Sequence, residues 1–95
     1  MRFKVEDKSM EPTLHSGDYV IAVKYIIRKP KEEDVVVLKH PKKEMKLIKR
    51  IRKIDNDKYF VEGNNRSYSS DSRDFGPIEK ESIIGKVMFL KSKNE

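Results

Sequence analysis

The sequence predicts a single, mainly β domain with little helix. Five short segments are rich in β-branched and aromatic residues, turn-forming residues separate them, and no repeat or linker divides the chain. At 95 residues the chain can form only one small core, because a domain of this size buries only about 60–65% of the surface exposed by its unfolded chain. We therefore expect one antiparallel β domain over residues 1–95.

Each strand is predicted from its composition and from the residues that end it. The five strands are expected at residues 18–27, 34–40, 44–55, 58–62 and 83–90. Pro30 and Pro41 end the first two, because proline cannot donate a hydrogen bond to a strand ladder. Residues 55–57 supply turn chemistry, so the third and fourth strands should form a hairpin. The polar segment 64–77 is expected to be a loop.

Composition and charge exclude several kinds of protein. The chain has 22 Lys and Arg against 16 Asp and Glu, a net charge of +6, which is typical of a nucleic-acid binder or a heavily solvated domain. The absence of cysteine excludes disulfides, thiolate nucleophiles and cysteine-based zinc sites. His15 and His40 are too few for a metal cluster unless carboxylates complete it. We expect neither a metal nor a cofactor.

The hydropathy pattern bears on location. No segment reaches the roughly 18–20 apolar residues needed to span a membrane. The first eight residues also lack the apolar middle region of a secretory signal. As written, the chain is expected to be cytoplasmic, and membrane-associated if the native protein carries an anchor ahead of this sequence.

The third predicted strand contains a lysine in an unusual setting. Because side chains alternate between faces, Lys49 shares a face with Leu47 and Ile51. If that face is buried, desolvation lowers the pKa of the lysine and suits it to act as a general base. The pattern alone favours the opposite outcome, in which Ile48 and Ile54 are buried and the lysine extends into solvent.

A second candidate lies just before the first predicted strand, in the run Ser-Met-Glu-Pro-Thr-Leu at residues 9–14. Pro12 restricts the backbone of this turn-prone segment. A serine on a tight turn can present its hydroxyl while nearby backbone N–H groups converge on one point, which suits a nucleophile with an oxyanion hole. The alternative is an ordinary helix cap, which the residues taken alone favour.

Four segments in this order resemble the signal peptidase I family of serine/lysine proteases. Residues 9–14 with Gly17-Asp18 are similar to its nucleophile box, and Lys49-Arg50-Ile51 is similar to its general-base box. Residues 63–77 resemble its Gly-Asp-Asn-Arg…Ser…Asp-Ser-Arg box, and residues 29–37 its Arg-Pro-x-x-Gly-Asp-Val-Val connection. Each box is weak alone, whereas four in order over nearly the whole chain are strong.

The resemblance implies a small antiparallel β fold of the signal peptidase and LexA-like catalytic type, and a serine endopeptidase. Ser9 would attack the scissile carbonyl and supply an oxyanion-hole N–H, with Lys49 as general base. Ser69 would orient the lysine amine. Met10 would lie at the substrate pocket, and the residues implied to support the site are Gly63, Asn65, Asp71 and Arg73.

Some positions depart from the family pattern. Asp7 stands where relatives usually carry Ser or Gly, and an ionised carboxylate cannot donate a hydrogen bond to an oxyanion. Asn64 replaces an Asp, which retains the shape and removes the charge. Lysine rather than histidine at position 49 resembles the bacterial members, and His15 and His40 lie outside the boxes.

The short interval between Lys49 and Gly63, 14 positions, is where larger relatives insert a second domain. The chain therefore resembles a minimal catalytic core, similar to small soluble members such as the nickel-type superoxide dismutase maturation proteases. The implied partner is a protein or peptide with small residues before the cleavage site, which loses a short N-terminal leader or signal-type extension.

Two other functions are considered. A basic β domain could bind single-stranded nucleic acid through residues 46–53 and stacking aromatics, which are Tyr19, Tyr25, Tyr59 and Phe60. Aromatic residues make up only 8% of the chain and are needed for the core, so no nucleic-acid partner is expected. A LexA-type self-cleaving domain needs an Ala-Gly or Cys-Gly pair upstream of the serine, and the eight residues before Ser9 contain none.

Overall fold

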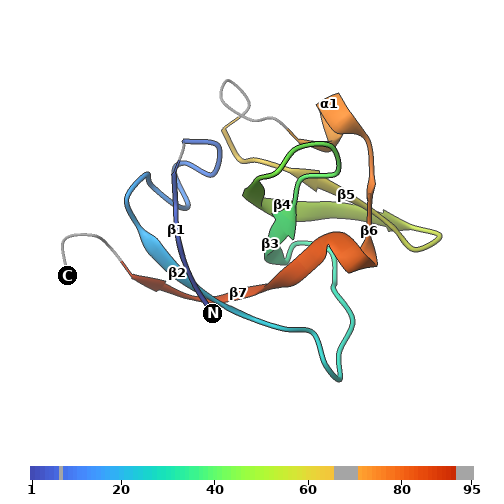
Figure 1. The fold of residues 1–95 in the computed structure, drawn as a ribbon, viewed down its shortest axis with the longest axis horizontal. Coiled ribbons are helices and arrows are strands. Elements are labelled where there is room, and N and C mark those ends of the chain that lie inside the picture. Colours follow the sequence, from blue (N-terminus) through green and yellow to red (C-terminus); the bar gives the residue numbers. More distant parts are fainter. Residues whose placement is uncertain (7, 66–70, 92–95) are drawn as a thin grey trace.

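The computed structural model describes residues 1–6, 8–65 and 71–91, which form one curled, seven-stranded antiparallel sheet with one short helix (Figure 1). The strands are β1 (Arg2–Lys4), β2 (Tyr19–Val23), β3 (Val35–Lys39), β4 (Lys46–Asp55), β5 (Lys58–Glu62), β6 (Ile78–Glu79) and β7 (Ile83–Lys91). The helix α1 spans Ser72–Phe75, and a 3-10 turn spans Lys80–Ser82. The predicted mainly β, antiparallel fold class is confirmed.

The strand order is β1-β2-β7-β3-β4-β5-β6, so β7, the last described strand along the chain, lies inside the sheet, between β2 and β3. In Figure 1, β7 runs between the β1–β2 ribbon and the strands that begin with β3. The pairing of β7 is close, because a Cβ added at Gly85 would lie only 2.8 Å from the carbonyl oxygen of Val23. Glycine therefore permits β2 and β7 to meet at this point.

Two clusters of buried side chains form the core. The first core cluster comprises Val36, Leu38, Leu47, Ile51, Tyr59, Val61 and Ile78. The second core cluster comprises Val5, Met10, Leu14 and Val20. The strand β3 serves both, since Val36 and Leu38 belong to the first while Val35 packs against the second.

The structure shortens one predicted strand. Residues 18–27 were expected to form a strand, but β2 ends at Val23, where its pairing with β7 ends at Lys86. Beyond that point the backbone has no ladder partner, and Ile26 and Ile27 are 85% and 95% exposed. Composition favours a strand in this segment, and the absence of a paired neighbour overrides that preference.

The prediction lacks two short strands, the helix α1 and the 3-10 turn. Among the described residues, β1 pairs with β2 and β6 pairs with β5, and each of these strands has three residues or fewer. The helix α1 lies in the segment predicted to be a loop. Asp71 caps this helix by accepting from Arg73 N, and Asp74 completes a capping box by accepting from Asp71 N.

Candidate active site

Ser9 lies in the turn between β1 and β2, and its side chain is only 2% exposed. Within this turn Leu14 N donates to Met10 O at 2.9 Å. The base of the turn is closed by Val5, whose N–H donates to Asp18 O at 2.8 Å. Met10 and Leu14 are both buried in the second core cluster, so the turn that carries Ser9 is fixed to the core.

The segment that follows β5 holds the same turn from the other side. Asn65 N donates to the carbonyl oxygen of Ser9 at 2.7 Å, and the Asn64 side-chain amide donates to Thr13 Oγ1. These contacts join residues more than fifty positions apart along the chain. The backbone at Ser9 is therefore positioned by residues from the resembling segment 63–77.

Lys49 lies on β4, directly opposite Val36 of β3, and is 1% exposed. It shares its face with Leu47 and Ile51, both members of the first core cluster. The alternative that the pattern favoured, burial of the opposite face with the lysine in solvent, is wrong. The reason is that side chains of β3, β5 and β6 cover the Leu47 face.

A small pocket of about 40 Å³ adjoins Ser9. It is lined by Lys4, Val5, Glu6, Ser9, Met10, Lys46, Leu47 and Ile48. The pocket therefore joins the Ser9 turn to the part of β4 that directly precedes Lys49. Its volume is close to that of one water molecule or one methyl group.

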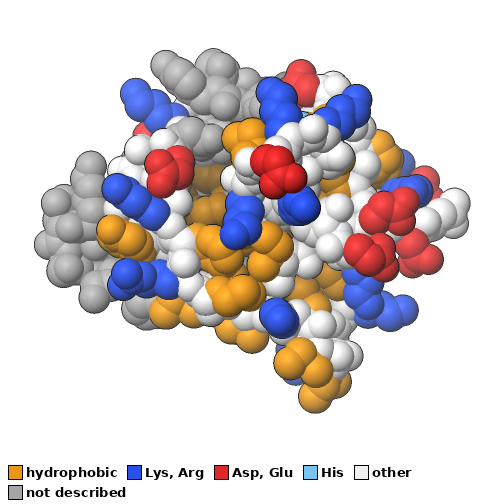
Figure 2. Space-filling view, viewed as in Figure 1, with side chains coloured by type: hydrophobic (Ala, Val, Ile, Leu, Met, Phe, Trp, Pro, Cys, Tyr) orange, Lys and Arg blue, Asp and Glu red, His pale blue; other side chains and the backbone are white. Residues whose placement is uncertain are grey.

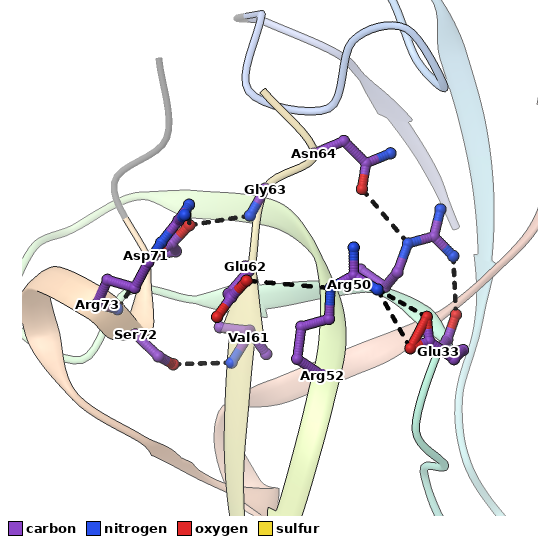
Figure 3. Close-up of polar contacts among 10 residues, drawn as sticks. All are labelled: Glu33, Arg50, Arg52, Val61, Glu62, Gly63, Asn64, Asp71, Ser72 and Arg73. Carbon is purple, nitrogen blue, oxygen red and sulfur yellow. Dashed lines mark hydrogen bonds and ion pairs between the residues drawn. The ribbon is translucent and has the colours of Figure 1, made fainter. Parts of the chain in front are cut away.

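Asp71 links the end of β5 to α1 (Figure 3). This fully buried carboxylate accepts from Gly63 N at 2.9 Å and from Arg73 Nε at 2.9 Å. The hydrogen bond with Asp71 raises the pKa of Arg73 above its ordinary value, so the guanidinium remains charged. Ser72 Oγ accepts from Val61 N at 2.8 Å, which adds a second link between α1 and β5.

Arg50 joins several segments around the site, and the sequence analysis assigns it no role. It donates to the carbonyl oxygen of Glu33 at 3.0 Å and, through Nε, to Asn64 Oδ1 at 3.4 Å (Figure 3). The sequence signal for it is its place directly after Lys49 in the general-base box. Arg50 connects β4 to Asn64, and the Asn64 amide in turn contacts Thr13 in the Ser9 turn.

The predicted site residues are brought together in two groups. Ser9 and Asn65 form one through their backbone hydrogen bond, and Gly63, Asp71 and Arg73 form the other. Ser69 and Asp7 lie outside the described residues.

The two histidines are not members of these groups. His15 is exposed and lies 3.7 Å from Glu11. His40 is buried in the turn after β3, where its ring stacks at a tilt against Phe75. Within residues 1–6, 8–65 and 71–91, no group of three or more His, Asp or Glu side chains is placed to hold a metal ion.

Comparison with known proteins gives consistent matches. The family model described as signal peptidase, peptidase S26, matches residues 1–52 and 52–91. Signal peptidase I V of Bacillus subtilis (strain 168) is 54% identical over 35 residues, which are 37% of this chain and 21% of that protein. Signal peptidase IB of Staphylococcus aureus (strain Mu50) is 53% identical over 36 residues, 38% of this chain and 19% of that protein. The matched segments thus span about a fifth of these two relatives.

Proposed function

Because the chain belongs to the signal peptidase family, peptidase S26, and is thereby a peptidase of the serine type, we propose that Ser9 and Lys49 form its catalytic dyad. The observation that carries this proposal is their burial. Among the residues that the structure describes, Lys49 is the one lysine whose side chain is buried, at 1% exposure, and Ser9 is 2% exposed. Burying a lysine side chain in a small basic protein costs free energy of desolvation, so such a residue is expected to have a structural partner or a function.

The proposed reaction begins with proton transfer. Burial favours the neutral form of an amine, so Lys49 Nζ can take the proton of Ser9 Oγ as that oxygen bonds to the scissile carbonyl carbon. The Ser9 backbone N–H stabilises the resulting oxyanion. The protonated lysine then gives its proton to the departing amine as the peptide C–N bond breaks. Water, activated by the same lysine, releases the acyl group and regenerates Ser9.

The surrounding residues are proposed to position the dyad. Ser69 orients the lysine amine, and Met10 borders the substrate pocket. Asp71 and Arg73 hold the segment that carries Ser69, with support from the backbone of Gly63 and Asn65. The hydrogen bonds from Gly63 to Asp71 and from Asn65 to Ser9 support this part of the proposal.

We propose a protein substrate with small residues before the scissile bond, from which a short N-terminal leader is removed. The pocket of about 40 Å³ beside Ser9 supports a small side chain at this position. The names of the Bacillus and Staphylococcus relatives support a leader or signal-type extension as the part removed. Residues 1–95 are proposed to form one minimal catalytic domain of the type found in small maturation proteases.

The nucleic-acid alternative depends on aromatic side chains that stack on bases. Tyr59 is instead buried in the first core cluster, and Tyr25 packs against that cluster and donates its hydroxyl to Asp34 at 2.6 Å. These two rings are therefore occupied in the fold, and we do not propose this function.

The test is cleavage of a fluorogenic peptide with alanines before the scissile bond. Ser9→Ala and Lys49→Met should each lower kcat/KM by about a thousandfold or more, because each removes a group that acts in the transition state. Lys53→Met, an exposed lysine on the same strand, is the matched control and should retain nearly full activity. Circular dichroism verifies that the variants fold. Wild-type turnover by Ser9→Ala or Lys49→Met would show that the dyad is assigned wrongly.

A further inference from the structure

The end of the β3–β4 hairpin that adjoins the pocket beside Ser9 is strongly basic. Lys4 and Lys46 line this pocket of about 40 Å³. Lys39 is the ladder partner of Lys46, and the turn 40–45 that joins the two strands adds two more exposed lysines. We call these lysines the basic rim, and its members are Lys4, Lys39, Lys42, Lys43 and Lys46.

The positive charge of the basic rim is not neutralised within the fold. Within residues 1–6, 8–65 and 71–91, none of the five lysines forms an ion pair with a carboxylate. The segments that carry the rim, 3–6 and 39–46, hold two carboxylates, Glu6 and Glu44. Positive charge therefore exceeds negative charge beside the pocket, which gives this surface a positive potential.

The opposite end of β4 is acidic. Asp55 and Asp57 lie at the β4–β5 turn, and Figure 2 shows Asp and Glu side chains gathered where Figure 1 draws this turn. The length of β4, ten residues, separates this acidic group from Lys46. An anionic ligand is therefore attracted to the end of the strand beside the Ser9 pocket and repelled from the other end.

The fold holds the rim lysines close together although their charges repel. Lys39 and Lys46 lie directly opposite each other in the ladder, where like charges destabilise a sheet. The buried His40 fixes the turn, because its Nδ1 accepts from Lys42 N at 2.9 Å and from Lys43 N at 3.1 Å. A bound anion would relieve the repulsion that this arrangement maintains.

We propose that the basic rim selects peptide substrates that carry acidic residues next to the small residue bound beside Ser9. The inference rests on the proposed function, which places that small residue in the pocket. Carboxylates of the substrate would lie against Lys4, Lys46 and the lysines of the hairpin. A single-stranded nucleic acid would need exposed rings on which its bases stack. The two rings on these segments are occupied, because Lys46 Nζ lies 5.7 Å from the centroid of Phe3 and His40 is buried.

The test measures binding of labelled peptides to the Ser9→Ala protein by fluorescence anisotropy, so that cleavage does not interfere. The peptides share a central run of alanines and carry Glu residues before it, Glu residues after it, or Gln at all these positions. At low salt we expect at least one acidic peptide to bind about tenfold more tightly than the Gln peptide. About 0.5 M salt should reduce this difference to less than about threefold. Equal affinities for the Glu and Gln peptides, or no binding of any peptide, would overturn the proposal.

Substitution of the lysines that line the pocket locates the preference. Lys4→Gln with Lys46→Gln should reduce the preference for Glu to less than about threefold. The matched control, Lys24→Gln with Lys53→Gln, makes the same change in net charge and should alter the preference less than about twofold. Lys53 is on the same strand, and its Nζ lies 5.9 Å from the centroid of the Phe60 ring. Equal losses in the two double variants would assign the effect to net charge and overturn the proposal.

Cleavage by the wild-type protein separates this inference from the dyad. Hydrolysis of the Glu and Gln peptides with equal kcat/KM, abolished by Ser9→Ala, would support the dyad and overturn selection by the basic rim. Preferential binding of a Glu peptide without any hydrolysis would support the basic rim and contradict the dyad. Tighter binding of an oligothymidine than of the acidic peptides, lost in the Lys4 and Lys46 double variant, would assign the basic rim to nucleic acid and overturn the proposal.

Discussion

At the scale of single residues, the carboxylate of Asp71 combines full burial with several hydrogen bonds. It is fully buried, and it accepts hydrogen bonds from the Gly63 backbone and from both the backbone and the guanidinium of Arg73. The Asp71 side chain thus caps the N-terminus of α1 and also bonds the backbone that follows β5. Its substitution affects an element boundary and an ion pair at once.

We predict that Asp71→Asn lowers the free energy of unfolding by about 2–3 kcal/mol, because an amide nitrogen replaces an oxygen that accepts from buried or charged donors. Asp74→Asn, an exposed carboxylate on the same helix, should cost less than about 1 kcal/mol. Urea unfolding followed by circular dichroism measures both. Equal costs for the two substitutions would contradict the role assigned to Asp71.

His40 should make stability depend on pH. Its Nδ1 accepts from Lys42 N at 2.9 Å and from Lys43 N at 3.1 Å, which requires that nitrogen to be unprotonated. Burial first, and then the charges of Lys43 and Lys42, lower the pKa of His40 below its ordinary value. The unfolded chain therefore binds a proton at a higher pH than the folded protein does.

We predict that the contribution of His40 is fully present above about pH 6.5, the ordinary histidine pKa, and decreases as the pH falls toward the lower folded pKa. Urea unfolding between pH 7.5 and pH 5 measures this decrease. His40→Asn retains an acceptor that does not titrate, so the variant should lose less stability over the same interval. An unchanged slope in His40→Asn would assign the pH dependence to other groups.

Residue-level chemistry is only partly predictable from the sequence. The motif that contains Lys49 is recognisable, but its burial is not, because the alternation of side chains favours the opposite face of β4 and the neighbours that decide the outcome are not visible in the sequence. The contacts of Arg50 with Glu33 and Asn64 likewise depend on pairing between distant segments. The burial of Lys49 is decided by the β3, β5 and β6 side chains packed on one face.

At the scale of elements, local sequence signals predict strand pairing well where two strands are joined by a short turn. The hairpin of β4 and β5 was predicted from turn residues and is confirmed, with Asp55 paired to Lys58. The strand β1 and the end of β2 were not predicted, because both depend on partners far away in the sequence. The residues after Val23 have strand-forming composition and no neighbour to pair with.

The β4–β5 turn offers a stabilising substitution. Asn56 and Asp57 both have positive φ, 49° and 65°, as a two-residue hairpin turn of this handedness requires. Asp57→Gly should raise the free energy of unfolding by roughly 0.5–1 kcal/mol, because glycine adopts this conformation without steric cost. Asp55→Gly, on the adjacent paired residue, should lower it by a similar amount. Thermal unfolding compares the two, and stabilisation by both would contradict the turn argument.

At the scale of the whole molecule, β3 contributes to both core clusters and β7 joins the two groups of strands. We predict that the chain unfolds as one unit. Val20→Ala in the second cluster and Val61→Ala in the first should each cost about 2 kcal/mol. Each should shift the tyrosine-fluorescence and circular-dichroism midpoints together. Separate transitions for the two probes in either variant would show two independent units and contradict the single-domain proposal.

The central place of β7 has a consequence for biosynthesis. During translation β1 and β2, and later β3 to β6, emerge from the ribosome before the strand that lies between them. Until residues 83–91 emerge, β2 and β3 each lack one neighbour, and loop closure across the sheet cannot be completed. Without β7, the strands on either side of it share no ladder hydrogen bonds, so the Ser9 turn and the Lys49 strand belong to two groups of strands that the sheet does not yet join. If Ser9 and Lys49 form the dyad, we expect proteolytic activity only once residues 83–91 have paired with β2 and β3.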